Sequence, residues 1–260
     1  MTRMRPIIAA TAVAGLGVLG VVAVPSMASA STPSCHGHHA TIVGHGHVRG
    51  TSHADVIVLT GPSVVYAGAG NDLICGSSGR DVIVAGSGAD VVYGFGGSDS
   101  IAGGDGNDKL DGGAGNDTLS GGAGSDRLTG DAGNDTESGG IGADIESGGI
   151  GDDTITGGAG NDVEHGNAGD DSVSGDAGND TISGDDGSDV ESGGLGDDVV
   201  SGGAGDDTLS GDDGDDVVSG DSGADELSGG TGDDSLDSGD DAGDVCDDAS
   251  DPAPVTPPTV

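Results

Sequence analysis

The sequence predicts an all-β fold, built as a stack of short coils whose strands run parallel, and three observations carry this prediction. A nine-residue pattern repeats without a gap from residue 67 to residue 237, which makes nineteen copies. Gly occupies the fourth position and Asp the sixth position of every copy. The eighth position is Ile, Leu or Val in fifteen copies. Such a short period is typical of repeat proteins in which each unit contacts only its neighbours.

The composition excludes several classes of protein. The 260 residues include 58 Gly, and 47 Asp or Glu stand against 6 Lys or Arg, for a formal net charge of −41. Trp is absent, and Tyr66, Tyr93 and Phe95 are the only aromatic residues. So few large apolar residues do not build the core of an ordinary enzyme, and the charge has the wrong sign for nucleic acid. The chain is therefore either disordered or folds when cations offset its charge.

The first thirty residues have the features of a secretory signal peptide. Two arginines precede an uncharged run from Ile7 to Val24, and a small-residue cleavage motif ends at Ala30. A retained membrane anchor is the alternative, because the 18 uncharged residues approach the length of a membrane span. We expect cleavage after Ala30, which leaves 4 basic and 47 acidic residues, a formal charge of −43. A secreted, extracellular protein with no membrane span after signal removal is predicted.

Changes of composition divide the chain into four parts. Residues 1–30 are the signal peptide, residues 31–49 a His-rich lead-in, residues 50–247 the repeat region and residues 248–260 a Pro-rich disordered tail. The repeat region includes a looser first copy at 50–58 and an imperfect last copy at 239–247.

Clustered imidazoles can bind a transition metal, or they form a polar lead-in that needs none. The clustered histidines are His36, His38, His39, His45, His47 and His53.

Each copy divides into a turn and a strand. The first six positions are rich in Gly, Asn and Asp, which form turns and tolerate positive φ. The last three positions place an apolar residue between Ser, Thr or Val, as in a short strand with one inward side chain. Such a turn and strand make half a coil, so two copies complete one coil. Residues 18 apart in the sequence then stack at a spacing of about 4.8 Å.

The stacked Asp residues at the sixth position predict cation sites. A column of carboxylates at this spacing repels itself unless a cation lies between neighbours. Gly-rich turns also expose backbone carbonyls, and an all-oxygen site in a flexible turn suits Ca²⁺ better than Zn²⁺ or Cu²⁺. The candidate ligands are Asp72, Asp81, Asp90, Asp99, Asp108, Asp117, Asp126, Asp135, Asp144, Asp153, Asp162, Asp171, Asp180, Asp189, Asp198, Asp207, Asp216, Asp225 and Asp234.

These copies closely resemble the RTX (repeats-in-toxin) nonapeptide family, the hemolysin-type calcium-binding repeat, with the pattern G-G-x-G-x-D-x-U-x. Residues 112–120, GGAGNDTLS, match it at every defined position. The resemblance implies a parallel β-roll, a β-solenoid, of about nineteen repeats with two repeats per coil. It also implies multiple Ca²⁺ ions in the turns, held by the position-six Asp and by backbone carbonyls of the Gly-rich turn.

The chain departs from the longer relatives in what precedes the repeats. Only residues 31–49 stand between the signal peptide and the first copy, too few for a catalytic core. The chain looks like the small, secreted, stand-alone members, so we expect no enzymatic activity and a structural or adhesive role outside the cell. Its partners would be calcium ions and a cell-surface or extracellular polymer.

An alternative function is surface recognition of ice, glycan or mineral through β faces lined by hydroxyl groups. One predicted face carries pairs of outward hydroxyl residues, although Ser and Thr are also ordinary outward residues of strands. The pairs are Thr118/Ser120, Thr136/Ser138, Thr154/Thr156, Ser172/Ser174 and Thr208/Ser210.

Cysteine and glutamate residues give two further expectations. Outside the cell disulfides persist, and a bond between Cys35 and Cys75 would tie the lead-in to the first regular copy. Cys246 is either a small buried residue or pairs between molecules.

The inward eighth position is Glu in four copies: Glu137, Glu146, Glu164 and Glu191. These copies are expected to be the softest part of the stack, unless the Glu head groups reach solvent.

Overall fold

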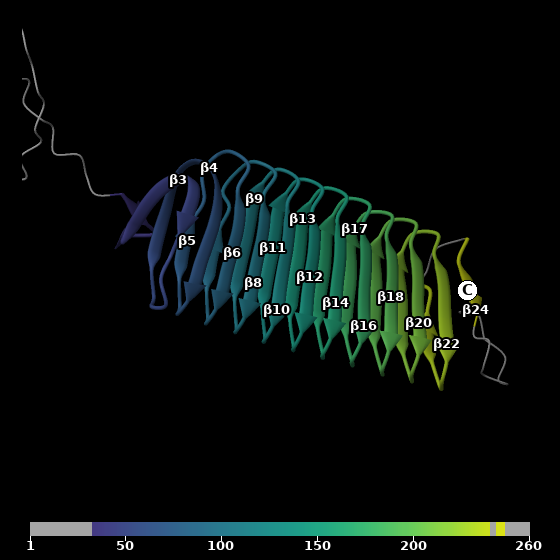
Figure 1. The fold of residues 1–260 in the computed structure, drawn as a ribbon. Coiled ribbons are helices and arrows are strands. Elements are labelled where there is room, and N and C mark those ends of the chain that lie inside the picture. The colour runs from purple at the N-terminus through teal and green to yellow at the C-terminus, as the bar shows by residue number, and fades with distance from the viewer. Residues whose placement is uncertain (1–32, 240–242, 248–260) are drawn as a thin grey trace, which may run out of the picture. The chain divides into compact units, whose positions relative to one another are not determined.

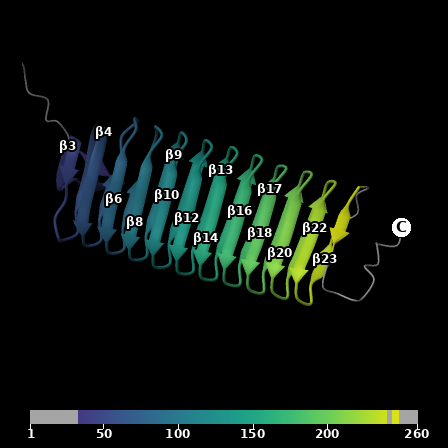
Figure 2. The same ribbon diagram turned by 45° about the vertical axis from the view of Figure 1, so that its right-hand side comes forward.

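A computed structural model describes residues 33–239 and 243–247. These residues form a parallel β-solenoid of about 11 turns, drawn out as a row of similar coils (Figures 1 and 2). The predicted signal peptide and the predicted C-terminal tail lie outside the described residues. Within the described ranges, no helix has the length and apolar character needed to cross a bilayer.

The regular strands are six residues long, which corrects the three-residue strand expected from the sequence. β10 (Thr118–Ala123) joins positions seven to nine of one copy to positions one to three of the next. Leu119 and Gly121 are buried, so each strand has two inward positions and not one. The Gly-rich start of each copy has the composition of a turn, yet its backbone continues the ladder, because a glycine with no side chain fits inside the coil. The turn between strands is therefore only three residues, Gly-x-Asp.

Strands pair in parallel with the second strand along the chain, so each coil contains two copies. Thr118 of β10 lies opposite Thr136 of β12 (Thr136–Ile141), 18 residues later. The same register continues through the turns, where the Gly124 N–H donates to the Ile141 carbonyl at 2.8 Å. Even-numbered and odd-numbered strands thus form two parallel ladders, as the period predicts.

One ladder continues from the second half of β4 (Val56–Ala69). Its strands are β6 (Val82–Ser87), β8 (Ser100–Asp105), β10, β12, β14 (Thr154–Ala159), β16 (Ser172–Ala177), β18 (Val190–Leu195), β20 (Thr208–Asp213), β22 (Glu226–Thr231) and β24 (Val245–Asp247). β3 (Ile42–Arg49) precedes both ladders because its two halves pair with the two halves of β4, and the other ladder continues from the first half of β4. Its further strands are β5 (Leu73–Cys75), β7 (Val91–Tyr93), β9 (Lys109–Ala114), β11 (Arg127–Ala132), β13 (Ile145–Ile150), β15 (Val163–Ala168), β17 (Thr181–Asp186), β19 (Val199–Ala204), β21 (Val217–Ser222) and β23 (Ser235–Asp237).

The solenoid begins before the nineteen regular copies, which explains why it has more turns than they provide. β3 pairs with β4 in a register that shifts between Gly44 and Gly46, so the regular period is lost there. Ahead of β3, a small hairpin of β1 (Ser34–Cys35) and β2 (His38–His39) lies at the N-terminal end. Its Cys35 forms a disulfide with Cys75, with an S–S distance of 2.06 Å. Near the other end, Cys246 carries a free thiol, is partly exposed and packs against the apolar core.

The apolar core is a narrow column of position-eight side chains that is divided in two. One cluster runs from Val48 to Leu128, and a second cluster runs from Ile155 to Leu227. Between them, position eight is occupied by Glu137 and Glu146. Each buried aliphatic side chain contributes about 1.5–3 kcal/mol, so the column is weakest where these glutamates interrupt it.

Candidate calcium-binding turns

The position-six aspartates lie in two columns, one at each edge where the coils turn. Each carboxylate uses one oxygen to join its coil to the coil before it. The Asp135 N–H donates to Asp153 Oδ1 at 2.7 Å, and the Asp153 N–H donates to Asp171 Oδ1 at 2.7 Å. The structure therefore brings together residues 18 apart, and an Asp inside a column, such as Asp153, lies between two stacked Asp neighbours.

The second oxygen of most of these carboxylates is buried and accepts no hydrogen bond. A buried carboxylate oxygen without a partner is costly, and in native proteins such groups are paired or bind a metal. The residues with this orphaned Oδ2 are Asp72, Asp90, Asp99, Asp108, Asp117, Asp126, Asp135, Asp144, Asp153, Asp162, Asp171, Asp180, Asp189, Asp198, Asp207, Asp216 and Asp234. A cation is the partner that fits an unpaired, negatively charged oxygen.

The electrostatics of the turns point the same way. Burial, together with the charge of the neighbouring Asp135 carboxylate, raises the pKa of Asp153 to about 6. Burial likewise raises the pKa of both Asp117 and Asp171 to about 7. Without a cation these carboxyl groups hold their protons more tightly than in the unfolded chain. A bound cation would replace the proton and allow both neighbours to be ionised.

Backbone carbonyls complete an all-oxygen lining. Gly124 has φ of +140°, a conformation that glycine adopts without strain. A Cβ atom built on Gly124 would collide with the carbonyl oxygen of Gly106 in the preceding coil, and one on Gly122 would collide with the carbonyl oxygen of Gly104. A carbonyl lies beside a carboxylate at Gly121, where an added Cβ atom would collide with Asp126 Oδ2 and would lie 2.7 Å from the Gly139 carbonyl oxygen. Carboxylate and carbonyl oxygens are the donor set that Ca²⁺ prefers, so the residues fit this ion.

In the first coils, backbone N–H groups donate to the second carboxylate oxygen, which the uniform pattern of the sequence did not reveal. Asp81 Oδ2 accepts the Ser77 N–H at 2.8 Å, so this candidate ligand already has a partner within the chain. At the start of the other column, Asp55 Oδ2 accepts the Thr51 N–H at 2.8 Å. The sequence gives only a weak sign of this difference: Ser77 and Ser78 occupy the second and third positions of their copy, where residues 112–120 have Gly and Ala.

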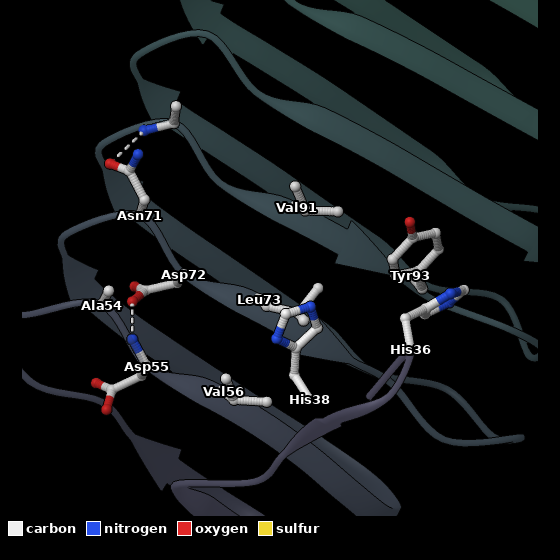
Figure 3. Close-up of a pocket in the computed structure, with 11 residues that line it drawn as sticks. His36, His38, Ala54, Asp55, Val56, Asn71, Asp72, Leu73, Val91 and Tyr93 are labelled. Carbon is white, nitrogen blue, oxygen red and sulfur yellow. Dashed lines mark hydrogen bonds between the residues drawn. The ribbon is translucent and has the colours of Figure 1, made fainter. Parts of the chain in front are cut away.

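The histidines of the lead-in do not come together as a metal site. His36 stacks on Tyr93 with ring centroids 4.0 Å apart, and His38 lines the same hollow of about 450 Å³ (Figure 3). Over residues 33–239 and 243–247, the groups of three potential metal ligands include no histidine. The hydrogen bond in that hollow from the Asp55 N–H to Asp72 Oδ1, at 2.8 Å, belongs to the Asp columns.

The outward hydroxyl groups of the predicted face lie in two neighbouring rows, as the sequence suggested. Thr118, Thr136, Thr154 and Ser172 are exposed and stack in register along one face. The next residue in this row is Val190, and only then does Thr208 follow. The adjacent row of Ser120, Ser138, Thr156, Ser174, Ser192, Ser210 and Ser228 continues without a break, so surface recognition stays a prediction.

Stacked parallel coils with oxygen-lined, acidic turns define a structural calcium-binding fold. A scan against protein families agrees with this geometry: the model of the RTX calcium-binding nonapeptide repeat matches segments between residues 49 and 242. The chain belongs to the RTX calcium-binding repeat family. A search of curated proteins found no match.

Proposed function

We propose that this protein is a secreted, multi-site calcium-binding protein whose folding is coupled to Ca²⁺ and whose role outside the cell is structural or adhesive, without enzymatic activity. The observation that carries the proposal is the pair of columns of buried Asp oxygens that accept no hydrogen bond. A fold that contains so many orphaned carboxylates is unstable while they are ionised without a bound cation. The disulfide between Cys35 and Cys75 supports an oxidising location outside the cytoplasm.

Charge arithmetic supports the coupling of binding to folding. The nineteen aspartates in two columns leave at most seventeen gaps between stacked neighbours. One Ca²⁺ in each gap would reduce the formal charge of the chain without residues 1–30 from −43 to −9. Because ions bind the folded chain and not the unfolded one, each occupied gap shifts the equilibrium toward the fold.

Calcium titration followed by circular dichroism tests the proposal. We expect little β structure in excess EGTA and a cooperative gain of β structure with a midpoint in the range of roughly 10⁻⁴–10⁻³ M Ca²⁺. Mg²⁺ serves as the control, because it requires a stricter octahedral geometry and gives up its water reluctantly. A protein that is fully β-structured in EGTA would contradict the proposal.

The location and the adhesive role need separate measurements. Expression with residues 1–30 in a secreting host should release a protein whose first residue is Ser31. Binding of that protein to cell-wall material, with calcium and with EGTA, tests adhesion. Equal retention on the wall material under both conditions would argue against a calcium-dependent adhesive role.

A further inference from the structure

The position-eight glutamates are buried, as their inward position predicts. Glu146 and Glu164 lie opposite each other on neighbouring strands, and both are 0% exposed. Their head groups therefore do not reach solvent, which rules out that alternative. Both oxygens of each head group are buried and accept no hydrogen bond. A fully buried carboxylate without a partner calls for a ligand of opposite charge.

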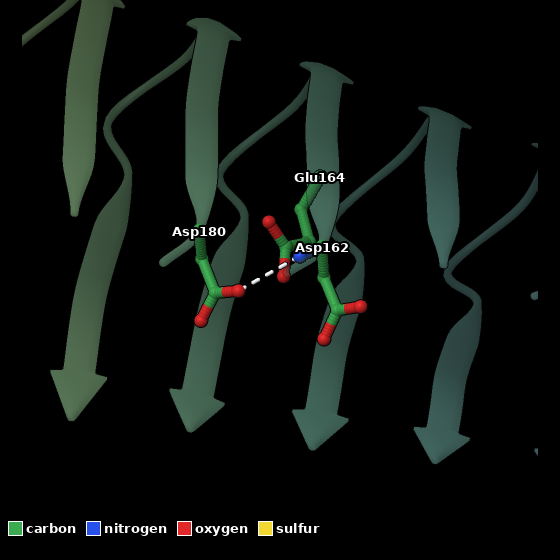
Figure 4. Close-up of side chains that lie close together, drawn as sticks. All are labelled: Asp162, Glu164 and Asp180. Atoms are coloured by element: carbon green, nitrogen blue, oxygen red, sulfur yellow. Dashed lines mark hydrogen bonds between the residues drawn. The ribbon is translucent and has the colours of Figure 1, made fainter. Parts of the chain in front are cut away.

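The Glu164 head group points at the column of aspartates. One oxygen each from Asp162, Glu164 and Asp180 lie within 4.8 Å of one another. Figure 4 shows the Glu164 carboxylate between the side chains of the two aspartates. Two oxygens bound to the same Ca²⁺, each at about 2.3–2.6 Å, lie no farther apart than about twice that distance, so the three carboxylates converge closely enough for one ion.

The one direct hydrogen bond within this group leaves the converging oxygens available. Asp180 Oδ1 accepts the Asp162 N–H at 2.8 Å (Figure 4), whereas Oδ2 of both aspartates accepts none. The backbone at this place also has no room for another side chain. A Cβ atom on Gly157 would collide with Glu164 Oε1 and would lie 2.8 Å from Asp162 Oδ2.

We propose that Glu164 joins Asp162 and Asp180, two stacked position-six residues, in a three-carboxylate cation site that binds Ca²⁺ more tightly than the turns without an inward glutamate. This inference rests on the proposed calcium-coupled function and adds a second class of site to it. A regular turn offers carboxylates from position six alone, whereas this site has an additional carboxylate from position eight. In oxygen-only sites, affinity rises with the number of charged ligands and with rigidity. The site therefore fills first as calcium is added.

The neighbouring coil extends this arrangement. A Cβ atom on Gly139 would collide with Glu146 Oε1 and lie 2.7 Å from Asp144 Oδ2. Asp144, Glu146, Asp162, Glu164 and Asp180 thus form an acidic ladder along one side of the solenoid. This ladder spans the break between the two apolar clusters. At this break, bound cations would stabilise the stack in place of the missing aliphatic contacts.

The test compares Glu164→Gln and Glu164→Leu with the wild-type chain and with Glu226→Gln. Glu226 is an exposed outward residue, so its variant makes the same chemical change at a side chain that faces solvent and not the buried carboxylates. Chelator-competition calorimetry with Ca²⁺ measures the tightest class of sites. Excitation spectra of bound Eu³⁺ report the charge of the ligands around the ion. Circular dichroism at saturating Ca²⁺ verifies folding.

We expect both Glu164 variants to lose the tightest class, with the first binding step weakened roughly tenfold and the matching Eu³⁺ band absent. The Glu226→Gln variant should retain both signals. The inference would be overturned if the Glu164 variants kept the tight class of sites. It would also be overturned if Glu164→Leu folded at a lower calcium concentration than wild type, because the Glu164 carboxylate would then only destabilise the core. Wild-type protein that takes up no Ca²⁺ would instead overturn the proposed function itself.

Discussion

At the scale of single residues, the position-six carboxylates serve two purposes at once. In Asp153, Oδ1 receives a backbone N–H from the preceding coil, and Oδ2 is buried without a partner. The first contact holds the stack in register, and the second oxygen makes the stack depend on a cation. The residue that shapes the turn is therefore the same residue that makes the turn unstable without calcium.

Substitution of Asp153 by Ala should weaken calcium binding at the gaps above and below it. Thr154→Ala, an exposed neighbour, is the matched control and should leave binding unchanged. Calorimetry should show a lower Ca²⁺ stoichiometry and a midpoint several-fold higher for Asp153→Ala, because two sites share its carboxylate. Equal stoichiometry and midpoint in the two variants would contradict the assignment of Asp153 as a ligand.

The sequence predicted the columns but not the exceptions within them. A strict period places every Asp beneath its copy, so the columns follow from counting alone. Asp81 Oδ2 accepts a hydrogen bond from the Ser77 N–H, and the period does not encode this local backbone contact. The direction of the Glu164 head group depends on side-chain packing around Gly157, which is equally hidden in the sequence.

At the scale of elements, the strands were longer than predicted for a physical reason. Positions one to three of each copy are rich in Gly and Asp, residues that favour turns when they stand alone. In the stack, the neighbouring coils supply a ladder partner on each side, and tertiary pairing outweighs the local preference. The irregular pairing of β3 with β4 was hidden because its register shift destroys the period.

The N-terminal hairpin gives a prediction at this scale. Double substitution of Cys35 and Cys75 by Ser removes a bond that joins residues 40 apart in the sequence. The first coils should open more readily, by on the order of 2–4 kcal/mol, while the number of bound Ca²⁺ ions stays the same. Hydrogen exchange in calcium should show faster exchange in β1 to β5 and unchanged exchange in β14 to β20. Uniformly faster exchange along the solenoid would show that the disulfide supports the whole stack.

At the scale of the whole molecule, stability without calcium should depend strongly on pH. Burial raises the pKa of Asp171 from 3.8 to about 7 and that of Glu164 from 4.5 to about 9. Groups whose pKa is higher in the folded state favour folding when protonated, and this contribution is lost as the pH rises through the folded values. In EGTA we therefore expect more β structure at pH about 5.5 than at pH about 8, as measured by circular dichroism.

Calcium should reverse this dependence. Because ions bind the ionised carboxylates, protons compete with them, and the calcium midpoint should rise as the pH falls. Concentrated NaCl is the control for general screening of the net charge of −41. Such screening acts only weakly on buried carboxyl groups. Identical spectra in EGTA at both pH values would mean that the buried carboxyl groups do not limit folding.

The 18-residue register also limits how the gene for such a protein can change in length. Duplication or loss of one 18-residue unit adds or removes a complete coil and creates no new kind of contact. Loss of one nine-residue copy moves every later copy to the opposite ladder of strands. Removal of residues 148–156 would place Glu164 beside Glu137 in place of Glu146 and divide the acidic ladder. Changes by an even number of copies therefore keep each later copy on its own ladder, whereas the Asp columns persist after any whole-copy change because every copy has Asp at its sixth position.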